Sequence, residues 1–413
     1  MIRKKTKLVE KPDDIILNVN ELIFEAVQRG CSDIHIEPFA ESVRIRFRID
    51  GRLYTEDTIS RLEYERYVSR IKVMSKLNIA EKRLPQDGSF NFDYENVNVD
   101  IRVSTISTIY GEKVVLRILE KDENKISLKN LGLNDEDLNK LLNLAKVDNG
   151  LIYLTGPTGC GKTTTLYSLL RELNDDRVNI ITVEDPVEFK ISGINQIQIN
   201  EKAGINFSNA LRAILRQDPE IILVGETRDK ETAQISVRSS ITGHKVFSTL
   251  HTNDSYSAIV RLLDMGVEDY LIRASLRGVV SQRLIRLLCP YCKREVSLSS
   301  DKIDYLKSIG ITEFPEKVYE PCGCEHCNEG YHGRKALVEI LVIDKDFREL
   351  IEPDVNLDAL KALGKKKDIK NLQYKGGVEF LMGNTSFEEL ANLSIVWWLI
   401  LKLLKKRLIN QFT

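Results

Sequence analysis

Eight consecutive residues have the types and the spacing that bind a triphosphate: Gly156-Pro157-Thr158-Gly159-Cys160-Gly161-Lys162-Thr163. The glycines let backbone N–H groups close around phosphate oxygens, and Lys162 is long enough to reach the terminal phosphates. The Thr163 hydroxyl would ligate Mg²⁺, and a helix that begins at about Thr164 would direct its N-terminus at the anion. The pattern predicts a site for a nucleoside triphosphate with Mg²⁺. A glycine turn between two core elements is the alternative.

Polar side chains follow other apolar runs of the same region. Glu184, Asp185 and Glu188 follow the run 178–183, Glu226 follows 221–224, and His251 follows 245–250. Parallel strands present their carboxyl ends at one edge of a sheet, where ligands bind. We therefore expect these side chains to meet beside the glycine loop and to act on the triphosphate. Ordinary solvated carboxylates are the alternative.

The elements that must position these residues alternate along the chain. Strands are expected over 151–154, 178–183, 221–224 and 245–250, and helices over 134–144, 164–170, 208–216 and 232–240. Strands that alternate with helices indicate a parallel sheet covered by helices. The predicted fold class is therefore α/β for this part of the chain.

Two pairs of cysteines have the spacing of a tetrahedral Zn²⁺ site, Cys289 with Cys292 and Cys324 with Cys327. We expect a zinc module over 288–335, inserted in the α/β domain. Buried cysteines that pack as small hydrophobic side chains are the alternative.

Other residues near these pairs are weaker ligands. Cys322 lies one residue too close to Cys324, and four thiolates fill the shell without His326 or His332. Cys31 and Cys160 fit best as inert packing residues.

The first part of the chain mixes helices and strands. Helices are expected over 15–27 and 62–77, strands over 32–38, 43–49, 97–103 and 113–119, and a turn over 83–88. This pattern predicts a small α+β domain over 1–119, followed by a charged linker over 120–133. Arg44, Arg46 and Arg48 alternate with apolar residues, so they are either solvated surface or a subunit contact.

Composition limits the possible classes of protein. The chain has 413 residues, 42% of them hydrophobic, and a net charge of −1, so it can fill packed cores but has no overall attraction to nucleic acid. No apolar run approaches the 18 residues of a membrane span, and no apolar segment of a signal peptide follows the basic start. The sequence predicts a cytoplasmic protein of two or more domains.

The end of the chain is expected to be helical past Glu339. Trp397 and Trp398 lie in a short apolar run followed by lysines, which could lie on an anionic membrane surface. A terminal helix docked on the core is the alternative, as is a poorly ordered tail.

From about Ile15 to Leu393 the chain resembles the secretion ATPase superfamily, in particular the type II secretion and type IV pilus assembly ATPases (GspE/PilB). The glycine loop matches the family's Walker A motif, 182–188 its aspartate box, and 242–252 its histidine box. Residues 221–226 match its atypical Walker B motif, with Gly225 at the usual aspartate position. Segments 32–37, 83–88 and 323–334 are also similar to the family.

The resemblance implies roles for single residues. Glu188 and Glu226, with Glu184 and Asp185 nearby, would orient or deprotonate the attacking water and help to hold Mg²⁺. His251 would approach the γ-phosphate, and His244 belongs to the same box. Arg102 and Arg117 match arginines of the N-terminal domain that reach the nucleotide when the domains close. Arg212 and Arg216 match arginines at the subunit boundary.

The resemblance also implies an assembly and a function. It implies a RecA-like ATPase domain over 134–413, with a helical region over 344–413, preceded by a PAS-like domain. The family's usual first N-terminal domain is expected to be absent. A cytoplasmic homohexamer would hydrolyse ATP and drive pilin or pseudopilin assembly through an inner-membrane platform protein. It would have no nucleic-acid partner and would lie at the membrane's inner face through its partners. Retraction ATPases lack the zinc module; a retraction ATPase, a scaffold without turnover and a nucleic-acid translocase are the alternatives.

Overall fold

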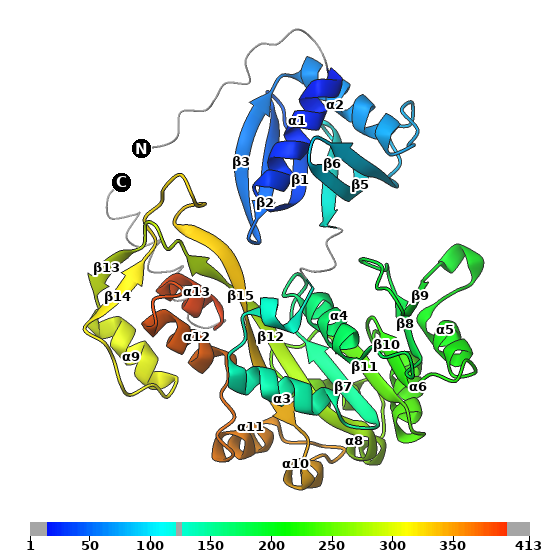
Figure 1. Cartoon of the computed structure of the whole chain (residues 1–413), viewed down its shortest axis with the longest axis vertical. Coiled ribbons are helices and arrows are strands. Elements are labelled where there is room, and N and C mark those ends of the chain that lie inside the picture. Colours follow the sequence, from blue (N-terminus) through cyan, green and yellow to red (C-terminus); the bar gives the residue numbers. More distant parts are fainter. Residues whose placement is uncertain (1–14, 121–125, 395–413) are drawn as a thin grey trace. The chain divides into compact units, whose positions relative to one another are not determined.

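The computed structural model describes residues 15–120 and 126–394. The chain forms two compact units, Met1–Asp122 and Glu123–Thr413, and each has its own sheet and apolar core (Figure 1). No described helix combines the length and the apolar composition that crossing a bilayer requires. The tail with Trp397 and Trp398 lies outside the described residues.

The first unit is a six-stranded antiparallel sheet with two helices. Its elements are α1 (Ile15–Gln28), β1 (Cys31–Pro38), β2 (Val43–Ile49), β3 (Arg52–Ile59), α2 (Arg61–Met74), β4 (Gln86–Tyr94), β5 (Val97–Thr108) and β6 (Gly111–Glu120). The strand order is β3-β2-β1-β6-β5-β4. Alternate residues of β2, from Val43 to Ile49, are buried against a core that includes residues of both helices. The predicted α+β architecture is confirmed, but the expected turn over 83–88 is too long, because β4 begins at Gln86.

The opposite face of this sheet is charged. Arg46 donates two hydrogen bonds to Glu37, of 2.7 and 3.0 Å, and Arg48 Nε lies 3.4 Å from an oxygen of Asp33. Although burial raises the pKa of Glu37, hydrogen bonds from Arg46 and Lys113 lower it to about 2. These two arginines of β2 therefore pair within their own unit, with carboxylates of β1.

The second unit is built on a seven-stranded sheet. Its elements up to the last sheet strand, apart from an insertion, are η2 (Leu128–Leu131), α3 (Asp135–Ala145), β7 (Gly150–Thr155), α4 (Lys162–Leu173), β8 (Ile180–Glu184), β9 (Asn195–Gln198), η3 (Glu201–Ala203), α5 (Phe207–Ile214), β10 (Ile221–Val224), α6 (Lys230–Ile241), β11 (Lys245–Leu250), α7 (Ser257–Asp264), α8 (Asp269–Ser275), β12 (Leu276–Leu288) and β15 (Tyr331–Val342). The order is β15-β12-β7-β11-β10-β8-β9, parallel except for β15. The predicted parallel sheet is confirmed.

Helices cover both faces of this sheet. Leu151 and Tyr153 of β7 join one core with residues of α5 to α8, whereas Ile152 and Leu154 join another with α3 and α4. Successive strand residues point to opposite faces, so a strand covered on both sides is apolar throughout. This is why β7, β10 and β11 read as unbroken buried runs.

The predicted linker over 120–133 is partly structural. Ile126, Leu128 and Leu131 are buried in the core under α3 and α4. Residues 126–133 therefore belong to the second unit, because their apolar side chains complete its core.

The cysteine-rich segment is an insertion between β12 and β15. It contains β13 (Arg294–Ser297), α9 (Ser300–Ser308) and β14 (Lys317–Glu320), and it is followed after β15 by α10 (Lys345–Glu349), α11 (Leu357–Lys366), α12 (Leu372–Leu381) and α13 (Phe387–Asn392). Tyr305 and Leu306 of α9 pack with Phe380 of α12 and Leu390 of α13. The predicted module over 288–335 overlaps β12 and β15 at its ends. The helical region begins after Val342 rather than Glu339, because β15 continues to pair with β12.

Candidate functional site

The glycine loop lies between β7 and α4, at the carboxyl edge of the parallel sheet (Figure 1). Gly161 has φ 86° and directly precedes α4, and a Cβ there would meet Gln282 Nε2 at 2.9 Å. Gly156 has φ 147°, and a Cβ there would meet Gln282 O at 2.5 Å. Both positions require glycine, so the loop keeps backbone N–H groups at the start of α4 for an anion.

Lys162 is held on its own loop. Its ammonium donates to the carbonyls of Gly156 at 2.7 Å and Pro157 at 3.1 Å. Burial lowers the pKa of Lys162. The side chain is therefore stationed over the loop, where a phosphate would offer stronger acceptors than these carbonyls.

The side-chain amide of Gln282, on β12, holds the glycine loop in place. Its Nε2 donates to Cys160 O at 2.8 Å, and its Oε1 accepts from Thr165 Oγ1 at 2.8 Å. Gln282 and Thr165 are fully buried. The amide thus connects the loop to the first turn of α4, a role that the sequence reasoning missed because β12 was not among the expected strands.

Glu226 and His251 lie close to each other at the carboxyl edge of the sheet. His251 Nε2 lies 3.7 Å from Glu226 Oε2, although the two residues follow different strands, β10 and β11. The Glu226 side chain is 16% exposed and that of His251 is 54% exposed. A buried hydroxyl beside Glu226 fixes the backbone here: Thr227 contacts Ser248 Oγ at 2.8 Å. The arrangement places a carboxylate and an imidazole at one point of the sheet edge.

Arg228 was not predicted and lies on the same carboxylates. One of its Nη atoms pairs with Glu226, and the other lies 3.7 Å from Asp185 Oδ2. The hydrogen bond to Glu226 raises the pKa of Arg228. Asp185 follows β8, so a single guanidinium contacts carboxylates from two adjacent strand ends.

Glu184 is turned into the protein. It accepts hydrogen bonds from Tyr167 and, at 2.6 Å, from Thr182, and burial raises its pKa. Glu188, which is half-buried, has its backbone N–H directed at Tyr167 Oη at 3.3 Å. Glu184 thus anchors the segment that carries Asp185 and Glu188; a direct part of Glu184 or Glu188 in the reaction remains a prediction.

His244 does not join these residues within one chain. It precedes β11, and its carbonyl accepts from Gly150 N at the start of β7. His251 follows the other end of β11, so roughly 20 Å of strand separates the two. The two histidines of the box therefore lie at opposite edges of the sheet, and a part of His244 in the reaction remains a prediction.

Arg212 and Arg216 also lie away from the glycine loop. Arg212 donates to Glu231 at 2.6 Å, and Arg216 donates to Arg212 O at 2.9 Å. The residues after α5 accept hydrogen bonds from Asn179, which precedes β8, so α5 ends at the amino edge of the sheet. Their predicted contact with a second subunit remains a prediction.

Arg102 and Arg117 are directly opposed on β5 and β6 of the first unit. Arg117 donates to Asp33 at 2.9 Å and is 61% exposed. The two arginines lie side by side on one face of the sheet, as residues paired across strands do. Their predicted approach to the nucleotide remains a prediction.

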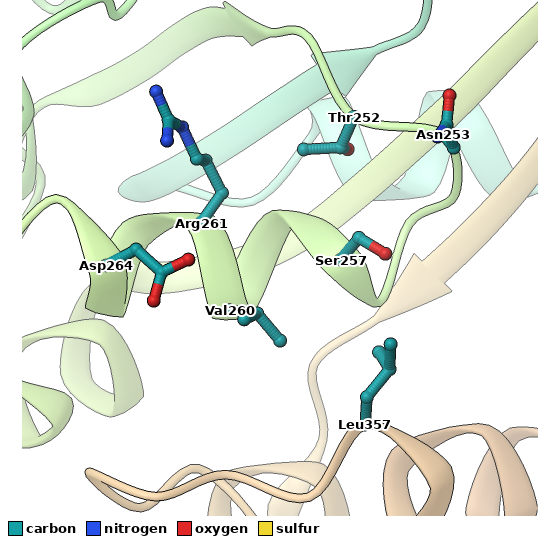
Figure 2. Close-up of a pocket in the computed structure, with 7 residues that line it drawn as sticks. All are labelled: Thr252, Asn253, Ser257, Val260, Arg261, Asp264 and Leu357. Carbon is teal, nitrogen blue, oxygen red and sulfur yellow. The ribbon is translucent and has the colours of Figure 1, made fainter.

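The loop after His251 is tied to distant parts of the second unit. Arg283 donates to Asn253 O at 2.9 Å, Asp254 lies 2.9 Å from Lys361 of α11, and Ser255 N donates to Glu339 at 2.9 Å. A small pocket of about 270 Å³ opens beside this loop, lined by Thr252, several residues of α7, and Leu357 (Figure 2). It includes no residue of the glycine loop, so it is separate from the triphosphate site.

The four predicted zinc ligands form one cluster. The sulfurs of Cys289, Cys292, Cys324 and Cys327 lie within 4.8 Å of one another. The individual S–S separations include 3.8 Å for Cys289 with Cys324 and 3.7 Å for Cys292 with Cys327. Tetrahedral coordination with Zn–S of about 2.3 Å requires sulfurs about 3.8 Å apart, so the donors fit zinc.

Backbone donors and the outlying cysteine agree with such a site. Gly323 N and Cys324 N donate to the sulfurs of Cys292 and Cys327, each at 3.2 Å, which favours thiolates. Cys322 is exposed and is not a member of the cluster. The four-cysteine arrangement was therefore predicted correctly from spacing.

Known proteins share both the sequence and the fold. A family model described as "Type II/IV secretion system protein" matches residues 9–392. The chain is 44% identical over 383 residues to a putative type II secretion system protein E of Escherichia coli K12, covering 92% of this chain and 77% of that protein. It is 46% identical over 357 residues to the type II secretion system ATPase E of Vibrio cholerae, covering 86% and 71%. It is 41% identical over 377 residues to the type IV pilus assembly ATPase TfpB of Acinetobacter baylyi, covering 91% and 64%.

Solved structures agree in fold. The pilus retraction motor PilT with bound ADP is 27% identical, with a TM-score of 0.61 over 91% of this chain and 96% of that one. The ATPase DotB of Legionella pneumophila is 20% identical, with a TM-score of 0.69 over 92% and 96%. The predicted resemblance and the predicted enzyme class, a P-loop ATP hydrolase, are confirmed by these matches. The chain belongs to the type II/IV secretion system protein family, the secretion ATPases.

Proposed function

We propose that this chain is a motor ATPase that uses Mg-ATP hydrolysis to drive pilin or pseudopilin assembly. The observation that carries the proposal is the meeting of Lys162, Glu226 and His251 at one sheet edge, in a chain of the secretion ATPase family. Phosphoryl transfer needs positioning and charge stabilisation more than covalent help, and these residues supply both.

The residues divide the work by their chemistry. The loop N–H groups and Lys162 would bind the phosphates, and Glu226 would orient and deprotonate the attacking water. Mg²⁺, which Thr163 and a carboxylate would hold, supplies neutralisation of the phosphate oxygens. His251 lies 3.7 Å from Glu226 and would couple the presence of the γ-phosphate to the position of the loop that follows His251.

The proposed motor is a cytoplasmic homohexamer that lies on the inner face of the cytoplasmic membrane through a platform protein. Arginines from the first unit or from a neighbouring subunit would complete the pocket, so that domain movement accompanies each hydrolysis. Arg102 and Arg117, Arg212 and Arg216 are the candidates. Support comes from the family and from the exposure of the Arg117 and Arg212 side chains.

The cysteine cluster favours assembly over retraction, because the family resemblance associates the zinc module with assembly ATPases. We propose that the cluster holds one structural Zn²⁺ per chain. Four sulfur donors leave no open position for water, which is the pattern of a structural rather than a catalytic metal.

Phosphate release by the unaltered chain and by Glu226→Gln tests the proposed hydrolysis. The variant keeps the size of the side chain but removes the base, so we expect turnover to fall by about 10²-fold or more. Binding of a fluorescent ATP analogue should persist. Glu136→Gln, an exposed change on α3, is the matched control and should turn over normally.

Two outcomes would contradict the proposal. Equal phosphate release by the unaltered chain and Glu226→Gln would favour a nucleotide-binding scaffold. Salt-sensitive DNA binding that stimulates turnover would favour a translocase instead.

A further inference from the structure

Arg228 is the one guanidinium, among the described residues, that pairs with both Glu226 and Asp185. Its side chain is 62% exposed, and it approaches from the segment between β10 and α6. The Lys162 ammonium donates its hydrogen bonds to the carbonyls of Gly156 and Pro157 rather than to these carboxylates.

The backbone on both sides of Arg228 is fixed. Before it, Thr227 N donates to Thr249 O at 3.0 Å, and the Thr227 hydroxyl contacts Ser248. After it, the Asp229 carboxylate accepts from Thr232 N at 2.8 Å and caps α6. Arg228 thus projects from a rigid segment, which keeps its guanidinium at the carboxylates.

The chemistry of the contact requires arginine. A guanidinium presents several N–H donors in one plane and can serve two carboxylates at once, whereas a lysine ammonium acts as a point charge. A carboxylate that is paired in this way keeps both its charge and its orientation. Both are required of a group that orients and deprotonates water.

We propose that Arg228 is a positioning residue for ATP hydrolysis, which ties Glu226 to Asp185 and so holds the Glu226 carboxylate toward the bound nucleotide. This inference rests on the proposed function. It assigns Arg228 no contact with substrate; Arg228 acts through Glu226.

Steady-state hydrolysis of Mg-ATP by full-length Arg228→Ala, Arg228→Lys and the unaltered chain tests the proposal. For Arg228→Ala we expect kcat to fall at least about tenfold while KM for ATP stays within about twofold. Arg228→Lys should recover kcat only in part, because it restores charge but not the two-carboxylate contact. Arg177→Ala removes an exposed arginine from a surface ion pair with Asp175 and should leave both constants unchanged.

The split between kcat and KM separates positioning from a merely structural role. A substitution that only loosened the fold would weaken nucleotide binding and stability as well, whereas a misplaced Glu226 carboxylate lowers kcat at an unchanged KM. Partial recovery of kcat by Arg228→Lys, again at an unchanged KM, would show that the contact with both carboxylates matters beyond the positive charge.

Each remaining outcome has a fixed meaning. A kcat of Arg228→Ala within twofold of the unaltered chain would overturn the inference, and so would a raised KM with unchanged kcat, since Arg228 would then bind nucleotide directly. If the unaltered chain releases no phosphate, the inference and the proposed function both fail. If the unaltered chain releases phosphate and Arg228→Ala does so equally well, the inference fails but the proposed function stands. Thermal unfolding of each variant excludes misfolding as the cause.

Discussion

At the scale of single residues, Gln282 supports the glycine loop from outside the loop's own sequence. Its amide pairs with Cys160 O and Thr165 Oγ1 in a fully buried position. A buried polar group that loses its partner costs about 1–3 kcal/mol. The glycine loop therefore depends on a strand residue that lies 122 positions further along the chain.

Gln282→Leu tests that dependence. We expect the free energy of unfolding to fall by about 1–3 kcal/mol in urea titrations, and KM for ATP to rise, because the loop loses its support. Gln373→Leu, on the half-buried surface of α12, is a control that should change KM little. An unaltered KM in Gln282→Leu would show that the loop is rigid without this amide.

The residues that the sequence could predict are those whose motifs are local. Lys162 and Thr163 follow from spacing, and Glu226 and His251 from their places after apolar runs. Arg228 and Gln282 could not be predicted in this way, because their roles come from contacts between separate strands. The separation of His244 from His251 has the same origin, because a motif that is continuous in sequence does not show that the whole of β11 lies between its two histidines.

At the scale of elements, apolar runs predicted every parallel strand that carries a motif. β12 was missed because its arginines and glutamine interrupt the apolar run: Arg283 and Gln282 lie inside the strand, where Gln282 and Arg286 are nevertheless buried. A pattern of apolar residues cannot predict that a polar side chain is buried when that side chain finds its partner inside the protein. The segment 126–131 was likewise expected to be linker, although its apolar residues fill a core.

The cysteine module gives a prediction for a whole element. Metal analysis should find about one Zn²⁺ per chain, and Cys324→Ser should lower the free energy of unfolding by about 4 kcal/mol or more, because metal binding is coupled to folding. Cys322→Ser is the matched control, since that cysteine is exposed and outside the cluster. A stable, metal-free protein would contradict the zinc assignment.

At the scale of the whole molecule, the two units must cooperate if the proposed motor is correct. The pair Arg102 and Arg117 is positioned by adjacent strands of the first unit, whereas the glycine loop belongs to the second. Sequence patterns gave the architecture of each unit, but they carry no information about how units or subunits meet.

Arg102→Ala with Arg117→Ala tests this cooperation. Arginines that stabilise the transferred phosphoryl group contribute about 10³-fold or more to kcat, so we expect a loss of that order in phosphate release. Arg83→Ala removes a highly exposed arginine of the first unit and is the control. Normal phosphate release by the double variant, together with equally fast release by isolated single chains, would contradict a motor that closes around ATP.

The shared packing of the cysteine insertion with α12 and α13 limits how this protein can change. Phe380 and Leu390, which come from the two helices, are fully buried beside Tyr305 of the insertion. A variant that lacked only the insertion would expose an apolar surface on those helices and would be prone to aggregate. The insertion and the last two described helices therefore form one packing unit, so that a change in one must be matched by a change in the other.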